Sequence, residues 1–150
     1  MDTYTLIYRY GQVALFEIIT IWYLTRILKR KNLVSVDIKK NKEKAINIIL
    51  KILFGICIIY VHVQTIIPHF KDIPYIVDGE YEIVRGTAVS SDMGKTNVDW
   101  HFRYFSVQEG NQTIYVEART KRVHVGDYIE VLYLPNSHLG TVIRRTESEE

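Results

Sequence analysis

The chain of 150 residues has room for one ordinary domain, or for a membrane segment with one small domain. Its single cysteine, Cys57, excludes an intramolecular disulfide and a metal site built on a pair of thiolates. The net charge of +2 combines a basic half and an acidic half: residues 1–70 hold ten Lys and Arg against four Asp and Glu, and residues 71–150 hold nine against thirteen.

The first apolar segment, Gly11–Leu28, has the composition of a helix that crosses a membrane, although Glu17 and Arg26 interrupt it. A buried or interfacial amphipathic helix is the alternative for a segment with two charges. A cleaved signal peptide is disfavoured, because the positive charge follows the apolar run and no small-residue cleavage site is present.

The second apolar segment, Ala45–Ile67, predicts a transmembrane helix. Its roughly 23 residues would form a helix about 34 Å long, which is enough to cross a bilayer. Lys51 is its only charged residue. Pro68 is expected to end the helix, because proline lacks the N–H that the next hydrogen bond needs.

A basic loop, residues 29–44, separates the two segments. Against Asp37 and Glu43 it holds Lys29, Arg30, Lys31, Lys39, Lys40, Lys42 and Lys44. Short loops rich in Lys and Arg stay in the cytoplasm, so both chain ends are expected outside it. Aromatic belts are expected at both membrane surfaces, with Tyr4, Tyr8 and Tyr10 at the outer one and Trp22 and Tyr23 at the inner one. Nucleic-acid binding by the loop is a weaker alternative, because such charges usually contact anionic lipid heads.

Glu17 and Lys51 are ionisable residues within the apolar segments, and their expected depths are similar. Glu17 precedes Arg26 by nine residues, roughly 13 Å, and Lys51 follows Lys44 by seven residues, roughly 10 Å. In an antiparallel hairpin they would form an intramembrane charge pair, which offsets part of the ~2.5–3.5 kcal/mol that each charge costs. The alternatives are that Lys51 extends toward the inner surface and that Glu17 is protonated or faces a partner protein.

The second half of the chain predicts a small all-β domain. Short alternating runs follow one another with turn residues between them and without a helix-length periodic run. The expected strands are Tyr81–Ser90, Trp100–Gln108, Gln112–Arg119, Tyr128–Tyr133 and Thr141–Ile143. Five short strands in about 65 residues are typical of a barrel of the OB or SH3 type.

Four residues of the last hairpin have structural reasons to be there. Gly126 can adopt the positive φ of a tight turn, and Asp127 can bond nearby backbone. Pro135 ends a strand because it lacks a donor, and Asn136 suits the turn that follows. We therefore interpret these residues as determinants of the fold.

The same hairpin carries a resemblance to a family. VGDYIEVLYLPNS…GTVI resembles the closing hairpin of a widespread family of uncharacterised bacterial membrane proteins, whose small β-barrel domain ends in a VGD-x-I/V-x-V-x-Y-x-P-N-S hairpin. RGTAVSS and FRYFSVQEGNQTIYVEA fall where that family has its first strand and central hairpin, so the resemblance covers roughly Ile83–Ile143. It implies an architecture and no activity. The chain departs from the family at His138, where the family often has proline, and in RRTESEE, where the family has a further membrane helix.

Aromatic and basic residues of the predicted second and third strands form a candidate ligand face. They are Trp100, Arg103, Tyr104, Tyr115, Arg119, Lys121 and Arg122. OB-type sheets often bind ligands on such a face, but alternate aromatic residues of a strand also fill barrel cores, and we favour this second interpretation. Nucleic acid is not an expected ligand, because the domain is net acidic.

No residue pattern predicts catalysis, a cofactor or a metal. His62 and His69 lie two helical turns apart, too far for one metal ion, and adding Asp72 does not produce metal-site spacing. No nucleophile elbow frames a serine, and no phosphate-binding glycine loop occurs. The expected protein is therefore not an enzyme.

The sequence thus predicts two domains. Residues 1–70 would form a two-span transmembrane helical hairpin with a cytoplasmic loop, and residues 71–150 an extracytoplasmic β-domain in the plasma membrane of a bacterial cell. The expected role is a non-enzymatic binding or assembly module at the cell envelope, for example a subunit of a membrane complex. Its expected partners are membrane lipid and another membrane protein or a second copy of the chain. The alternative is an immunity-type or sensory protein that intercepts a peptide or toxin.

Overall fold

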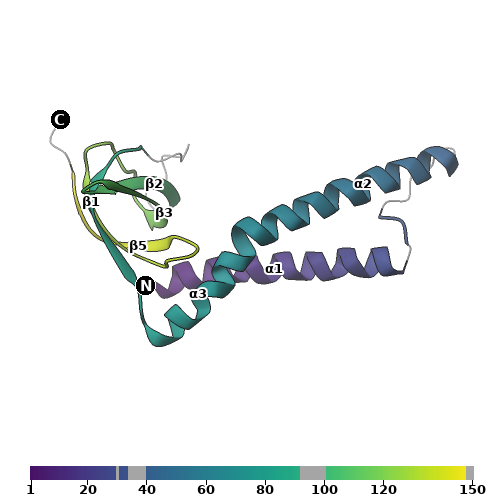
Figure 1. Ribbon diagram of the computed structural model, residues 1–150, viewed down its shortest axis with the longest axis horizontal. Coiled ribbons are helices and arrows are strands. Elements are labelled where there is room, and N and C mark those ends of the chain that lie inside the picture. Colours follow the sequence, from purple (N-terminus) through teal and green to yellow (C-terminus); the bar gives the residue numbers. More distant parts are fainter. Residues whose placement is uncertain (30, 34–39, 92–100, 148–150) are drawn as a thin grey trace. The chain divides into compact units, whose positions relative to one another are not determined.

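The computed structural model describes residues 1–29, 31–33, 40–91 and 101–147, and it divides the chain into two compact units. Arg9–Pro68 forms the helical unit, and Met1–Tyr8 together with His69–Glu150 forms the barrel unit (Figure 1). The expected division after residue 70 is close to this one, except that the first eight residues group with the barrel. Seven residues of the basic loop, 30 and 34–39, lie outside the described residues.

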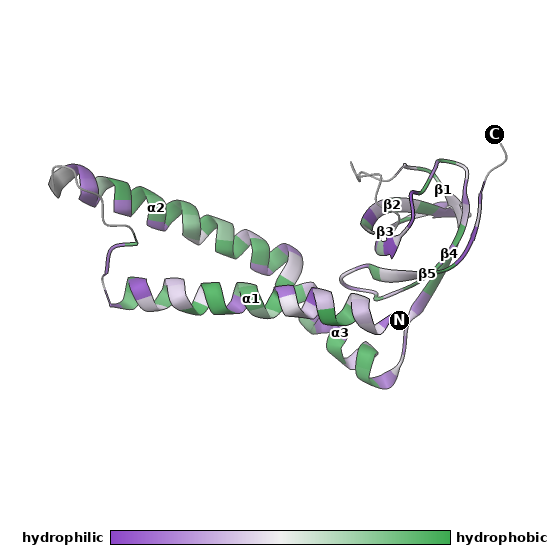
Figure 2. Ribbon diagram, turned by 180° about the vertical axis from the view of Figure 1, so that it is seen from behind, coloured by the Kyte–Doolittle hydropathy of each residue, from purple (hydrophilic) through white to green (hydrophobic). Residues whose placement is uncertain are grey.

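Two long helices, α1 (Thr3–Leu28) and α2 (Lys40–Val61), run antiparallel in the helical unit. Segments Thr3–Leu28 and Lys42–Asp78 are long and apolar enough to span a membrane. Figure 2 shows apolar residues along most of α2 and polar ones where it begins. α1 starts earlier than the predicted Gly11, because the Asp2 carboxylate accepts hydrogen bonds from the N–H groups of Tyr4 and Thr5, both at 3.3 Å, and so caps the helix.

The helix does not end at Pro68 as predicted. α2 continues through a π-helical turn, η1 (His62–Ile66), into α3 (Ile67–Asp78). In a regular α-helix the ring of Pro68 would clash with the carbonyl four residues earlier, and the wider turn just before it relieves that contact. The Ile67 N–H accordingly bonds to the His62 carbonyl, five residues back. α3 ends at Gly79, whose φ of 72° is a common helix terminator.

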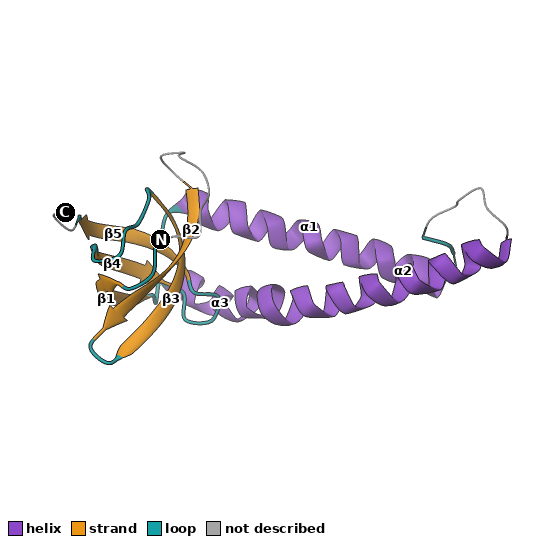
Figure 3. Cartoon of the chain, turned by 90° about the horizontal axis from the view of Figure 1, so that it is seen from above, coloured by secondary structure: helices purple, strands orange, loops and turns teal. Residues whose placement is uncertain are grey.

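In the part of the chain that the structure describes, five strands form a closed barrel in the order β1-β2-β3-β5-β4 (Figure 3). They are β1 (Glu82–Ala88), β2 (His101–Glu109), β3 (Gln112–Thr120), β4 (Tyr128–Tyr133) and β5 (Leu139–Thr146). Neighbouring strands are antiparallel except β3 and β5, which are parallel. The prediction of a small five-stranded barrel is confirmed, and the last strand is longer than predicted.

Alternate side chains of the strands fill the barrel. The buried cluster comprises Val84, Ala88, Phe105, Val107, Val116, Ala118, Val123, Ile129, Val131 and Tyr133. β1 and β2 approach each other closely at Gly86, where a Cβ atom would overlap the backbone carbonyl of Gln108. Only glycine allows this contact, which helps to close the barrel.

The turns that connect the last strands have special backbone conformations. Gly126 adopts the expected positive φ, at 99°. His138 has a φ of 57° and donates its N–H to the Leu134 carbonyl at 3.0 Å. Proline has neither that φ nor an N–H, so this turn could not hold a proline at position 138.

The β4–β5 turn is bound to α3 within the barrel unit. Asp72 of α3 is fully buried and accepts hydrogen bonds from the Asn136 N–H at 3.0 Å, the Asn136 side-chain amide at 2.8 Å and the Ser137 N–H at 2.8 Å. A carboxylate holding three donors fixes this turn firmly. Asp72, weighed above as a metal ligand, is thus a structural residue that orients the barrel on α3.

Candidate functional sites between the helices and on the barrel

The sides of α1 and α2 that face each other are more polar than their outward sides. The least exposed residues of the helical unit recur at helical spacing and are Val13, Thr20, Tyr23, Asn47 and Ile66. Outward side chains are large and apolar, and Ile18, Ile21 and Ile56 are each more than 60% exposed. Helix pairs in water show the opposite distribution. We call these five residues, together with Glu17 and His62, which also face each other between the helices, the polar stripe.

Glu17 faces His62 across the polar stripe, with 3.3 Å between Glu17 Oε1 and His62 Nε2. His62 Nδ1 lies 2.8 Å from the Ile58 carbonyl, which only accepts, so Nδ1 carries a proton. The two side chains thus give each other a polar partner, which lowers the cost of placing both groups between the helices.

The expected Glu17–Lys51 charge pair is not formed. Lys51 lies level with Tyr23, whose hydroxyl donates to the Lys51 carbonyl at 2.6 Å, so it is more than a helical turn deeper than Glu17. The sequence-based depths of Glu17 and Lys51 assumed that Arg26 and Lys44 lie at the same depth in the membrane. In the structure, α2 extends further beyond the Tyr23–Lys51 hydrogen bond than α1 does, so that assumption is wrong. From the sequence, His62 was weighed only as a metal ligand together with His69, and not as a partner of Glu17.

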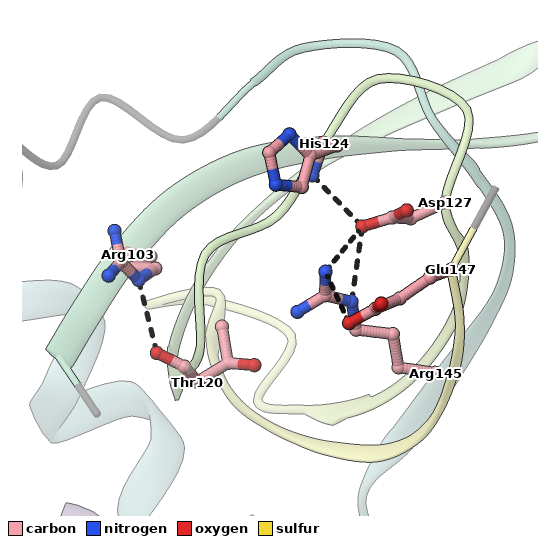
Figure 4. Close-up of polar contacts among 6 residues, drawn as sticks. All are labelled: Arg103, Thr120, His124, Asp127, Arg145 and Glu147. Atoms are coloured by element: carbon pink, nitrogen blue, oxygen red, sulfur yellow. Dashed lines mark hydrogen bonds and ion pairs between the residues drawn. The ribbon is translucent and has the colours of Figure 1, made fainter. Parts of the chain in front are cut away.

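The candidate ligand face does not form one surface. Arg103 is 1% exposed and lies inside the barrel with Phe105 and Val107, where its Nε donates to the Thr120 carbonyl at 3.1 Å (Figure 4). Lys121 and Arg122 follow β3 as exposed residues, and Trp100 lies outside the described residues. Arg103, Phe105 and Val107 are spaced two residues apart along β2, so the sequence alone could have placed all three on the inner face of the strand.

Tyr104 and Tyr115 remain together on the outer face of β2 and β3. Their rings stack with centroids 6.1 Å apart and an angle of 12° between planes, and both are more than one-third exposed. Burial, followed by the charge of Tyr104, raises the pKa of the Tyr115 hydroxyl, which therefore stays protonated at neutral pH. The pair offers a flat aromatic surface with a hydrogen-bond donor.

The first turns of α1 occupy the neighbouring part of this face. The Tyr8 ring stacks on Phe102 with centroids 5.1 Å apart, and the Arg119 guanidinium lies 4.4 Å from the centroid of the Tyr4 ring. Tyr4 and Tyr8, expected in a membrane-surface belt, thus contact the barrel. Arg119 therefore contacts the N-terminal segment of the chain. Local sequence motifs do not reveal a contact between residues so far apart in the sequence.

Asp127 organises a cluster of charges at one end of the barrel (Figure 4). This buried carboxylate accepts hydrogen bonds from the His124 N–H at 2.9 Å and from Arg145 Nε at 3.1 Å. Arg145 Nη2 lies 2.9 Å from Asp127 and 3.3 Å from Glu147. A pocket of about 300 Å³ beside it is lined by Thr120, Lys121, Val142, Arg145 and Glu147. Because Arg145 is already paired, the cluster joins the turn before β4 to β5.

Among the described residues, no three His, Cys, Asp or Glu side chains are grouped so that they could hold a metal ion. Comparison of the chain with family models, curated proteins and solved structures finds no match. The function is therefore inferred from the polar stripe and from the barrel surface.

Proposed function

We propose that this protein is a two-span membrane protein that holds a β-barrel at the outer surface of the cell membrane as a non-enzymatic binding or assembly module. The polarity of the helix pair carries the proposal. Its outward side chains are apolar and its inner stripe contains Glu17, Thr20, Asn47 and His62, which is the distribution that lipid favours. The basic loop supports a cytoplasmic connection between the helices.

The strand order supports a barrel of the OB type, a five-stranded Greek-key barrel. Proteins of this type commonly bind ligands on the face of their second and third strands. The stacked Tyr104 and Tyr115 lie on that face, and aromatic side chains with a polar tip are frequent at protein interfaces. The relation to uncharacterised bacterial membrane proteins stays a prediction that rests on the final hairpin.

The anchor is tested by labelling single cysteines in a Cys57→Ala background. Lys31→Cys reports the loop and Gln112→Cys reports the β2–β3 hairpin of the barrel. A maleimide that does not cross membranes should label Gln112→Cys in intact cells and Lys31→Cys only after permeabilisation. Labelling of both without permeabilisation, or of neither, would contradict the proposed topology.

The binding role is tested by placing a photo-crosslinking amino acid at Tyr104 or Tyr115 in cells. Tyr128 of β4, which is similarly exposed at 40%, provides the matched control. A discrete product from positions 104 and 115, absent from position 128, would support a partner on this face, and its mass separates another protein from a second copy. A product that forms only when a peptide or toxin is added would favour the protective or sensory alternative.

A further inference from the structure

α3 has three distinct faces. Its buried face holds His69 and Asp72, and Asp72 binds the β4–β5 turn. Lys71 and Asp78 lie on an exposed polar face. Between these faces runs an exposed apolar stripe about 120° wide, at 100° per residue. The α3 stripe consists of Ile67, Phe70, Ile73, Pro74 and Val77.

We infer that the α3 stripe lies in the lipid surface of the membrane, where it seats the barrel unit at the boundary between headgroups and acyl chains. The inference rests on the proposed membrane anchor and adds to it a second, interfacial contact. Exposed fractions are 53% for Phe70 and 78% for Val77, which are large values for apolar residues on a helix whose opposite side is already packed.

The length of the helix from Lys42 to Asp78 indicates that lipid covers the α3 stripe. The 37 residues of Lys42–Asp78 would measure about 55 Å, whereas the hydrocarbon core of a bilayer is about 30 Å thick. For all 37 residues to lie within the hydrocarbon core, the helix would have to tilt by about 57° from the bilayer normal. Transmembrane helices tilt by roughly 0–40°. A span that starts near Ala45 leaves the hydrocarbon near Ile67, where α3 begins.

The composition of α3 agrees with this depth. A helix with an apolar face and a polar face settles with its apolar side roughly 5–10 Å into the headgroup and acyl boundary. Lys71 and Asp78 exclude full burial in hydrocarbon. With one exposed cation and one exposed anion on its polar face, α3 has no excess of positive charge to attract anionic lipid, so its contact is apolar and independent of salt.

Collision accessibility of spin labels tests the inference on the full chain in phosphatidylcholine vesicles. All variants carry Cys57→Ala, so each has a single labelled cysteine. The stripe is labelled at Phe70→Cys, Ile73→Cys or Val77→Cys, and the control label is at Lys71→Cys on the polar face of the same helix. A label on native Cys57, an exposed residue within α2, reports the membrane span itself. The ratio of collisions with oxygen to collisions with a water-soluble nickel chelate should be at least about threefold higher on the stripe than at Lys71, for side chains roughly 5–10 Å deep.

The outcomes separate this inference from the anchor. Stripe labels that favour the nickel chelate while Cys57 favours oxygen would overturn the lipid contact and leave the anchor standing. Stripe labels shielded from both reagents would also overturn it, because another protein would then cover α3. A Cys57 label that favours the nickel chelate would refute the membrane anchor. Repetition at high salt should leave the stripe values unchanged.

Discussion

The two units of this protein distribute polarity in opposite ways. The barrel encloses Val84, Phe105 and Ile129 and exposes polar residues, as a protein domain in water does. The helical unit exposes Ile18 and Ile56 and encloses polar side chains. Chain composition alone hides this contrast, because the mean hydropathy of the whole chain is −0.02. The comparison teaches that burial identifies a core only when the surrounding solvent is known.

Several polar side chains inside both units nevertheless have polar partners. Arg103 in the barrel bonds to the Thr120 carbonyl, and Tyr133 donates to Glu82 at 2.6 Å. In the helical unit, Glu17 contacts His62. The rule that a buried polar group needs a partner therefore applies to both units, whatever surrounds them.

The largest expected effect comes from glycine in the barrel. Gly86→Ala places a Cβ atom on the Gln108 carbonyl and should destabilise the barrel by about 3 kcal/mol or more, because backbone must move. The free energy of unfolding is measured by chemical unfolding of the full chain in mild detergent, with near-ultraviolet circular dichroism as the signal. Gly11→Ala in α1 is the matched control, since a Cβ there meets no atom within 4 Å, and it should be neutral. Equal stability of the two variants would contradict the close approach of β1 and β2.

One isoleucine from each unit tests the opposite polarity directly. Ile56 of α2 is 61% exposed and Ile143 of β5 is 56% exposed. Ile56→Asp should cost about 2.5–3.5 kcal/mol if its surroundings are lipid, whereas Ile143→Asp should change stability by about 1 kcal/mol at most. The fraction of each variant that resists carbonate extraction from membranes gives the comparison. Membrane integration of Ile56→Asp at the wild-type level would break the contrast.

Much of the fold could be predicted because it depends on local patterns. The short alternating runs in the second half of the chain predicted the strands, and the long apolar runs predicted the helices. The continuation past Pro68 was missed because a π-helical turn leaves no clear signal in a single sequence. Long helices were thus easier to predict than their ends.

The candidate sites were harder to predict because they depend on pairing between distant segments. The helix register brings His62, and not Lys51, to Glu17. Likewise, the fold brings Tyr4 to Arg119 and Asp72 to Asn136. Arg103 is different, since its two-residue spacing from Phe105 was sufficient to place it inside.

A smaller effect is expected for the Tyr133–Glu82 hydrogen bond of the barrel. Burial, followed by the hydrogen bond to Glu82 and the charges of Glu82 and Glu109, raises the pKa of Tyr133 above its ordinary 10.0. The folded state therefore keeps a proton that the unfolded chain loses, so this contribution is complete below pH 10 and is lost as the pH rises toward the folded pKa. Tyr133→Phe should cost about 1 kcal/mol at pH 8 and should flatten the loss of stability above pH 10. Unfolding at pH 8 and pH 11 measures both, and an unchanged alkaline slope would contradict it.

The smallest effect is expected in the helical unit, for the Glu17–His62 pair. Glu17→Gln keeps the shape of the side chain and replaces the carboxyl group by an amide that can still bond to His62 Nε2, so the expected loss is small. Contacts between polar groups of membrane helices average about 0.6 kcal/mol and reach about 1.7 kcal/mol. The loss on SDS-induced unfolding in mixed micelles should fall in this range.

A double-mutant cycle decides which partner Glu17 has. Glu17→Gln combined with His62→Gln should show a coupling of about 0.6–1.7 kcal/mol, because either single change alters the same contact. Glu17→Gln combined with Lys51→Met should be additive, since Lys51 lies beside Tyr23 and more than a helical turn from Glu17. Coupling in the second cycle and additivity in the first would restore the sequence-based pair and would mean that α1 and α2 pack in a different register. The two cycles share the Glu17 variant, so a general weakening of α1 affects both equally and cancels from the comparison.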